Sequence, residues 1–159
     1  MPKLKRFVEP GAGYFVTSVT SERRAIFRDE RAVRLFLTIL RDYKEELSFK
    51  VHGYVVMPDH VHLFLQPGGS ASLSEIMKRV KGKFARRYNR EIKPIGTVWQ
   101  HSFHEEGLRN EAAFWKKMNY ILENPVRKGL TASSGAFPFS SATVYLEGVE
   151  DGITDRYPA

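Results

Sequence analysis

Residues 49–66 of the chain read FKVHGYVVMPDHVHLFLQ. The two halves of this stretch, 49–57 and 60–66, are rich in β-branched and aromatic residues, a composition typical of strands. Between them, Pro58 and Asp59 favour a tight turn. The stretch therefore predicts two antiparallel strands joined as a hairpin.

Hydrophobic periodicity places further elements on both sides of this hairpin. They are a strand at 13–20, a helix from Asp29, a helix that Ser72 caps, a strand at 98–103, and a helix from Asn110 that ends near Asn124, before Pro125. The order β-α-β-β-α-β, followed by one more helix, predicts an α+β fold. We expect a ferredoxin-like split arrangement with an antiparallel sheet and a C-terminal helix.

The length of 159 residues is that of one domain. We expect this domain to comprise residues 1–130. Residues 131–159 are rich in Ser, Gly and Pro and predict an irregular tail packed on it, with Phe137, Phe139 and Tyr145 as anchors. The acidic stretch from Glu147 onward is expected to be loose.

Composition excludes several kinds of site. The chain has no cysteine, which rules out disulfides, thiolate zinc sites, iron–sulfur clusters and cysteine nucleophiles. The charged N-terminal residues lack the apolar run of a signal peptide, and no run of about 18 apolar residues occurs. We therefore expect a cytoplasmic protein that does not bind membranes.

The positive charge is concentrated in one helix. The chain carries 25 basic and 18 acidic residues, a net charge of +7, and residues 78–93 hold eight of the basic residues but only one acidic residue, Glu91. A solvated helix face is one interpretation. The shortage of acidic partners favours contact with a polyanion, so we predict phosphate contacts. The predicted contacts on this helix are Arg79, Lys81, Lys83, Arg86, Arg87 and Arg90.

The strand at 60–66 presents a histidine pair. Side chains alternate along a strand, so His60 and His62 share one face and can converge on a metal ion. Two unrelated surface or core histidines are the alternative. A pair is an incomplete ligand set, so a third ligand must come from elsewhere.

The helix from Asn110 offers both a ligand and a nucleophile. Tyr120 points away from the apolar stripe and shares a polar face with Lys116, Lys117 and Asn124. Nearby cations stabilise a phenolate, so Tyr120 is a candidate nucleophile. The Asn124 amide is a candidate third metal ligand. Packing of Tyr120 against the tail is the alternative.

Several segments occur in an order that resembles a known family. They are VVMPDHVH at 55–62, SLSEIMKRVKG at 72–82, GTVWQ at 96–100 with Phe103, NYILENPVRKGL at 119–130 and PFSS at 138–141. Together they resemble the REP-associated tyrosine transposases, within the single-tyrosine HUH transposase superfamily. The resemblance covers nearly the whole chain.

This resemblance implies an enzyme that cleaves and rejoins single-stranded DNA at palindromic repeats that form hairpins. It implies that His60, His62 and Asn124 bind Mg or Mn, and that Tyr120 forms a 5′-phosphotyrosine intermediate. Lys116 and Lys117 are expected to contact DNA. The enzyme is expected to act as a monomer or homodimer, with residues 1–130 as its catalytic domain.

Two other functions remain open at this stage. One is a nucleic-acid-binding module without catalysis, and the other is a metal-dependent phosphodiesterase in which water attacks. Trp99 is either a core residue or a stacking platform for a base. His101 and His104 are weaker candidate ligands, and we do not assign them to the site.

Overall fold

The computed structural model describes residues 13–157. Its centre is an antiparallel sheet of strand order β2-β3-β1-β4. The strands are β1 (Gly13–Val19), β2 (Phe49–Met57), β3 (His60–Pro67) and β4 (His104–Leu108). The α-helices are α1 (Glu30–Glu46), α2 (Leu73–Glu91), α3 (Glu111–Leu122), α4 (Asn124–Arg127) and α5 (Ala142–Glu147). The predicted α+β fold with a ferredoxin-like order of elements is confirmed.

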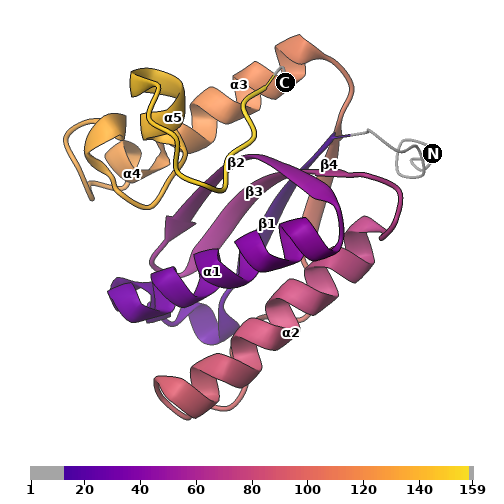
Figure 1. Cartoon of the computed structure of the whole chain (residues 1–159). Helices are drawn as coiled ribbons and strands as arrows, with labels where there is room; N and C mark the ends of the chain where they lie inside the picture. The colour runs from indigo at the N-terminus through magenta and orange to yellow at the C-terminus, as the bar shows by residue number, and fades with distance from the viewer. Residues whose placement is uncertain (1–12, 158–159) are drawn as a thin grey trace.

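The helices form two layers, one on each face of the sheet. Helices α1 and α2 cover one face, while α3, α4 and α5 lie over the other (Figure 1). On the α1 and α2 side, Val61, Leu63 and Leu65 of β3 are buried in the larger core cluster. Phe64, the intervening residue, belongs to the second cluster, with Met118 of α3. Alternate side chains of β3 therefore pack into two separate cores, one on each face of the sheet.

Gly53 allows α3 to approach the sheet closely. A Cβ atom at this position would lie 2.5 Å from Cε of Met118 and 3.4 Å from Phe64. The register of β2 against β3 also shifts between Val51 and Gly53. The absence of a side chain at Gly53 thus leaves room for the helix that carries Tyr120.

Side-chain caps fix the starts of the three long helices, as the sequence predicts. Asp29 accepts a hydrogen bond from the backbone N–H of Arg31, Ser72 from that of Glu75, and Asn110 from that of Ala113. The end of α3 differs slightly from the prediction. It lies at Leu122, and Asn124 begins the separate short helix α4, whose first turn accommodates Pro125.

The prediction of the fourth strand at 98–103 is wrong. The strand that pairs with β1 is His104–Leu108, an exposed edge strand. Val98 and Trp99 resemble a strand because they are apolar, but they are buried against the α1 and α2 layer. The Trp99 ring packs against Phe36 and Phe84, and its only strand-like pairing within residues 13–157 is an isolated bridge to Thr20. Tertiary burial, rather than sheet pairing, explains their hydrophobicity.

The tail is more ordered than predicted. It contains α5 and runs along the free edge of β2, where the backbone N–H of Val56 donates to Phe139 and that of Ser141 donates to Tyr54. The anchors are confirmed, since Phe137 is buried and the other two predicted anchors pack against the second core. This pairing covers an edge that would otherwise expose unpaired backbone groups.

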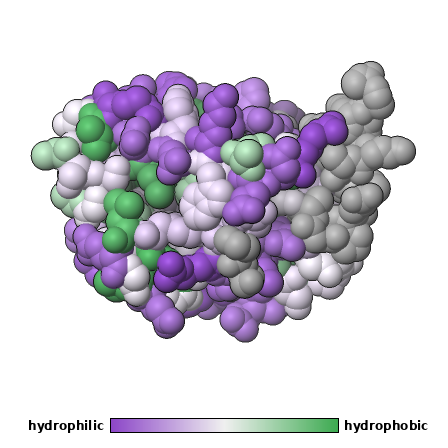
Figure 2. Space-filling model, turned by 90° about the horizontal axis from the view of Figure 1, so that it is seen from above, coloured by the Kyte–Doolittle hydropathy of each residue, from purple (hydrophilic) through white to green (hydrophobic). Residues whose placement is uncertain are grey.

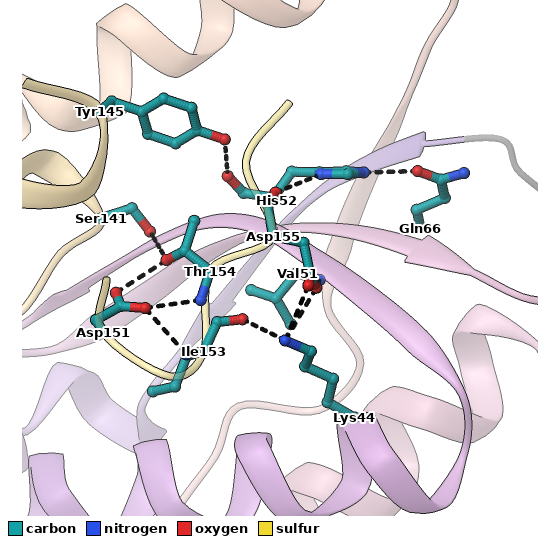
Figure 3. Close-up of polar contacts among 10 residues, drawn as sticks. All are labelled: Lys44, Val51, His52, Gln66, Ser141, Tyr145, Asp151, Ile153, Thr154 and Asp155. Carbon is teal, nitrogen blue, oxygen red and sulfur yellow. Dashed lines mark hydrogen bonds and ion pairs between the residues drawn. The ribbon is translucent and has the colours of Figure 1, made fainter. Parts of the chain in front are cut away.

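The expectation of a loose acidic end is wrong for the described part of the tail. Asp155 accepts hydrogen bonds from Lys44 Nζ and from the backbone N–H of Val51 (Figure 3). Asp151 accepts from the backbone N–H groups of Ile153 and Thr154. These acidic residues are therefore structural acceptors. No helix within residues 13–157 is long and apolar enough to cross a membrane.

Candidate active site

The histidine pair lies on the sheet face that α3 and α4 cover in part. The ring centroids of His60 and His62 are 4.7 Å apart, and the ring planes are inclined by 76°. Phe15 of β1 stacks on His62, at 5.2 Å between centroids. The strand period therefore brings the two imidazoles together as the sequence predicts.

Each histidine has a different partner at Nδ1. Nδ1 of His60 lies 2.7 Å from Oδ1 of Asp59, and Nδ1 of His62 lies 2.8 Å from Oγ1 of Thr17. A carboxylate can only accept a hydrogen bond, so Nδ1 of His60 carries the proton. The Nε2 atom of His60 then has a free lone pair, which is the arrangement that a metal-binding imidazole requires.

Asn124 supplies an amide beside the pair. It is buried, with 5% of its surface exposed, and its Nδ2 atom lies 3.5 Å from Nε2 of His60. Rotation of the amide by half a turn would present its oxygen instead. No cluster of three His, Cys, Asp or Glu side chains forms within residues 13–157. Two imidazoles and an amide oxygen nevertheless fit a divalent ion whose remaining ligands are water or phosphate oxygens.

Burial and cations keep the histidines neutral. Burial lowers the pKa of His62 to about 3, and the charges of His60, Lys117 and Arg127 add to this effect. Burial also lowers the pKa of His60, although Asp59 opposes the shift. Neutral imidazole is the form that binds a metal ion. The cations that act on this pair also make its surroundings attractive to a phosphate group.

Tyr120 lies at the exposed end of α3, with 54% of its surface accessible. The guanidinium carbon of Arg127 lies 3.9 Å from the centre of its ring, and Nη2 of Arg127 donates to its backbone carbonyl. Arg127 also lowers the pKa of His62. Arg127 thus connects the exposed phenol to the neighbourhood of the histidines.

The surface of the layer formed by α3, α4 and α5 is partly apolar. The exposed large apolar residues among those the structure describes all lie in this layer. Tyr120 is on α3, Val126 on α4 and Leu146 on α5, while Leu130 follows α4 and Val149 follows α5. Viewed from that side, hydrophobic residues gather at the end of the molecule where α4 and α5 lie (Figure 2). The surface of this layer is therefore not uniformly charged.

The basic helix α2 lies on the opposite face of the sheet from the histidine pair (Figure 1). The charge concentration and the candidate metal site are therefore not on one surface. Between α1 and α2 is a shallow groove of about 590 Å³, whose lining includes Lys78, Arg79 and Arg86. Its lining also includes Glu75, which lies 3.7 Å from Arg79.

Other predicted contacts on α2 already have partners within the chain. Arg87 forms two hydrogen bonds to Glu91, and Arg90 forms one to the same residue. Lys83 lies over the ring of Tyr43. Lys81 is half-buried and donates to the carbonyl of Ser102, and burial lowers its pKa. In this conformation Lys81 holds the segment before β4.

Of the two lysines predicted on α3, Lys116 is exposed and Lys117 lies closer to the site. Nζ of Lys117 is 3.0 Å from Glu106 of β4 and 5.0 Å from the centre of the Phe15 ring. His104 is exposed on β4, opposite Thr17. Trp99, with 8% exposure, belongs to the core and donates to the carbonyl of Lys81.

Sequence reasoning missed five residues around the pair: Thr17, Arg23, Asp59, Arg127 and Lys128. Asp59 directly precedes His60, and this adjacency in the sequence could have indicated a contact between the carboxylate and the imidazole. Arg127 and Lys128 follow Asn124 within about one helical turn, so their positive charges could have been expected near the candidate ligand. Thr17 and Arg23 are distant in sequence, and only the pairing of β1 with β3 brings Thr17 to His62.

Comparison with known proteins places this site in a family context. The family described as transposase IS200 like matches residues 11–123, more than half of the chain. The chain belongs to this family. The resemblance seen in the sequence is thereby confirmed, and the matched residues include His60, His62 and Tyr120.

Similar proteins extend beyond the part matched by the family. A REP-associated tyrosine transposase of Escherichia coli (strain K12) is 25% identical over 142 residues, which covers 89% of this chain and 82% of that protein. A solved structure of a REP-associated tyrosine transposase bound to a REP hairpin has a TM-score of 0.74 at 22% identity. The alignment covers 99% of this IS200-like transposase and 96% of the solved chain, so the two share a fold.

Proposed function

We propose that this chain cleaves and rejoins single-stranded DNA at hairpin-forming repeats, with Tyr120 as the nucleophile. The observation that carries the proposal is that two imidazoles and a buried amide meet on the sheet face that α3, the helix of Tyr120, covers in part. The relatives described as REP-associated transposases, one of them bound to a hairpin, support the substrate class.

His60, His62 and Asn124 would hold the divalent ion, Mg or Mn. A bound ion would offset the negative charge of the oxygens on the scissile phosphate and so make its phosphorus easier to attack. The protein contributes neutral imidazoles, because burial keeps the pKa of both histidines low. Lys117 and Arg127 add further positive charge beside the pair.

In the cleavage step, Oη of Tyr120 loses its proton and bonds to the phosphorus. The bond from phosphorus to the 3′-oxygen breaks, and that oxygen takes up a proton to become a free 3′-hydroxyl. The downstream fragment stays attached to Tyr120 through its 5′-phosphate, and the upstream fragment leaves with the 3′-hydroxyl. Attack by another 3′-hydroxyl reverses the step, so the covalent bond conserves the energy for rejoining. Arg127 orients the phenol by stacking on its ring.

The basic groove beside α2 would bind the phosphate backbone of DNA that extends past the catalytic face, together with the predicted contacts on that helix. Lys116 and Lys117 would contact DNA on the catalytic face. Residues 1–130 would form the catalytic domain, with residues 131–159 packed on it. We assign the activity to the cytoplasm, where a monomer or homodimer would meet chromosomal DNA.

A covalent adduct tests the nucleophile. The protein is incubated with Mn²⁺ and a hairpin DNA carrying single-stranded flanks, then resolved in detergent. We expect a DNA–protein adduct with the unaltered protein. Tyr120→Phe should bind the hairpin with unchanged affinity and give no adduct. Phe keeps the ring beneath Arg127, so the variant removes only the hydroxyl. An adduct in Tyr120→Phe would show that another residue attacks.

The same assay separates the rival functions. Cleavage without an adduct would identify a phosphodiesterase that uses water, and binding without cleavage would identify a non-catalytic module. His62→Ala, or omission of the ion, should abolish cleavage while circular dichroism shows an unchanged fold. Unaltered cleavage in either case would overturn the proposed metal site.

A further inference from the structure

Asp59 links an arginine to the first histidine of the pair. One carboxylate oxygen, Oδ1, lies 2.7 Å from Nδ1 of His60, and the other, Oδ2, lies 3.0 Å from Nη1 of Arg23. The Asp59 carbonyl accepts hydrogen bonds from both the backbone N–H and the hydroxyl of Thr20. The carboxylate is therefore held from two sides, with one oxygen aimed at the imidazole.

The backbone that presents Arg23 is strained. Glu22 and Arg23 both have positive φ, 55° and 51°, and they are the only two consecutive residues other than glycine with this conformation within residues 13–157. Such conformations are costly and persist where the surrounding structure imposes them. Here two strained residues bring a guanidinium to the carboxylate that contacts His60.

We propose that Arg23 and Asp59 are positioning residues that fix the tautomer and ring orientation of His60 for metal binding. Asp59 requires a proton on Nδ1 of His60, which leaves the Nε2 lone pair facing the amide of Asn124. Arg23 neutralises the carboxylate and restricts its rotation. The inference rests on the proposed metal site, because it assigns a role toward the ion that this site would hold.

A purely structural role for the pair is a poor explanation. The Arg23 side chain is 61% exposed and that of Asp59 is 28% exposed, and ion pairs of this kind contribute little to stability. The turn itself is already held by Thr20 and by the donation of the Phe27 backbone N–H to the carbonyl of Pro58. What only the Asp59 carboxylate supplies is therefore the contact with the His60 imidazole.

Nuclear magnetic resonance of the imidazole nitrogens tests this inference without metal or DNA. In the metal-free full chain, His60 should be protonated at Nδ1. Asp59→Ala should shift the proton toward Nε2, whereas Asp59→Asn should retain the Nδ1 tautomer because its amide oxygen still accepts a hydrogen bond. An unchanged tautomer in Asp59→Ala would overturn the proposal, whether or not the chain cleaves DNA.

Titration with Mn²⁺ supplies the second measurement. Asp59→Ala should weaken Mn²⁺ binding by about 10- to 100-fold, and Asp59→Asn and Arg23→Gln by less. Arg34→Gln is the matched control, because Arg34 forms an exposed ion pair with Glu30 on the opposite layer and its loss removes the same charge. Equal weakening in Arg23→Gln and Arg34→Gln would show that the effect does not depend on the contact of Arg23 with Asp59 and would overturn the role of Arg23. Should the wild type bind Mn²⁺ but form no DNA adduct, the proposed function alone would fail.

Discussion

At the scale of single residues, neighbouring side chains of the same type acquire different roles from their partners. His60 and His62 are two positions apart on β3, yet one contacts a carboxylate and the other a hydroxyl from β1. Ser18 and Ser141 are both fully buried serines, but Ser141 has hydrogen-bond partners and Ser18 Oγ has none in the described part of the chain. The contacts, and not the residue type, decide what each side chain contributes.

Replacing Ser18 by Ala should stabilise the protein. A buried hydroxyl without a partner has lost its hydrogen bonds to water and gained none, so its removal should raise the free energy of unfolding by about 1 kcal/mol. Urea unfolding at pH 7 measures the change. A lower unfolding free energy would mean that the hydroxyl has a partner.

Ser141→Ala is the matched control and should have the opposite sign. Oγ of Ser141 accepts from the backbone N–H of Tyr54 at 3.0 Å and bonds to the hydroxyl of Thr154 at 2.8 Å. Its loss leaves a buried N–H unpaired and should lower the free energy of unfolding by roughly 1 to 2 kcal/mol.

At the scale of elements, the tail and β2 form one unit. The Tyr145 hydroxyl donates to the carbonyl of His52, where the strand register shifts, and it accepts from the backbone N–H of Tyr157. This one phenol therefore connects α5, the bulged part of β2 and the end of the described tail. Docking of the tail on β2 also places Phe137 and Phe139 against the second core, beneath the helices that carry the site.

The tail contact predicts a loss of stability at alkaline pH. Burial raises the pKa of Tyr145 from 10 to about 12, so the folded state favours the neutral phenol. Stability from this group is complete below pH 10 and is lost as the pH rises from 10 to about 12. Tyr145→Phe should therefore melt at a lower temperature than the wild type at pH 8.

The difference between the two melting temperatures should shrink between pH 10 and pH 12. Thermal unfolding followed by circular dichroism at both ends of this range measures it. Tyr54, whose pKa burial also raises, is present in both proteins and does not contribute to the difference. A constant difference across this range would contradict the role of the Tyr145 hydroxyl.

At the scale of the whole molecule, the sheet separates the two surfaces that we propose to be functional. The histidine pair and Tyr120 lie on the α3 side, and the basic groove lies between α1 and α2 on the other side. DNA that contacts both must pass around the sheet. The tail covers the edge at β2, whereas β4 is an exposed edge. The edge at β4 is thus the more open of the two edges.

Neutralising α2 tests whether it contacts phosphates. Replacing Arg86, Arg87 and Arg90 together by Gln should weaken hairpin binding and lower the slope of log affinity against log salt by roughly 2 to 3. Binding is measured by fluorescence anisotropy across a series of salt concentrations. At saturating DNA, adduct formation should be unchanged, because these residues lie on the face opposite Tyr120.

The control removes the same charge from the adjacent helix, by replacing Arg31, Arg34 and Arg41 of α1 with Gln. This variant should change affinity much less than the α2 variant. Equal effects would show that only net charge matters, and an unchanged salt slope in the α2 variant would identify a solvated helix face.

The sequence by itself determined the first three strands, the three long helices and the chemistry available to the site. Alternation in 60–66 put His60 and His62 on one face, and helical period separated Tyr120 from the apolar stripe of α3. The capping residues placed the helix starts correctly. These features are local, because backbone geometry sets the period of each element over a few residues.

Only the tertiary structure decided which residues meet. Thr17 and His62 are 45 positions apart, Asn124 and His60 are 64 apart, and neither spacing encodes a contact. The charge of α2 is evident in the sequence, but the face of the sheet that this helix covers is not. Trp99 is apolar, as strand residues often are, and only the fold shows that it is a core residue outside the strands. Periodicity shows which side of an element is apolar, but the face of the sheet that it covers depends on how all the elements pack together.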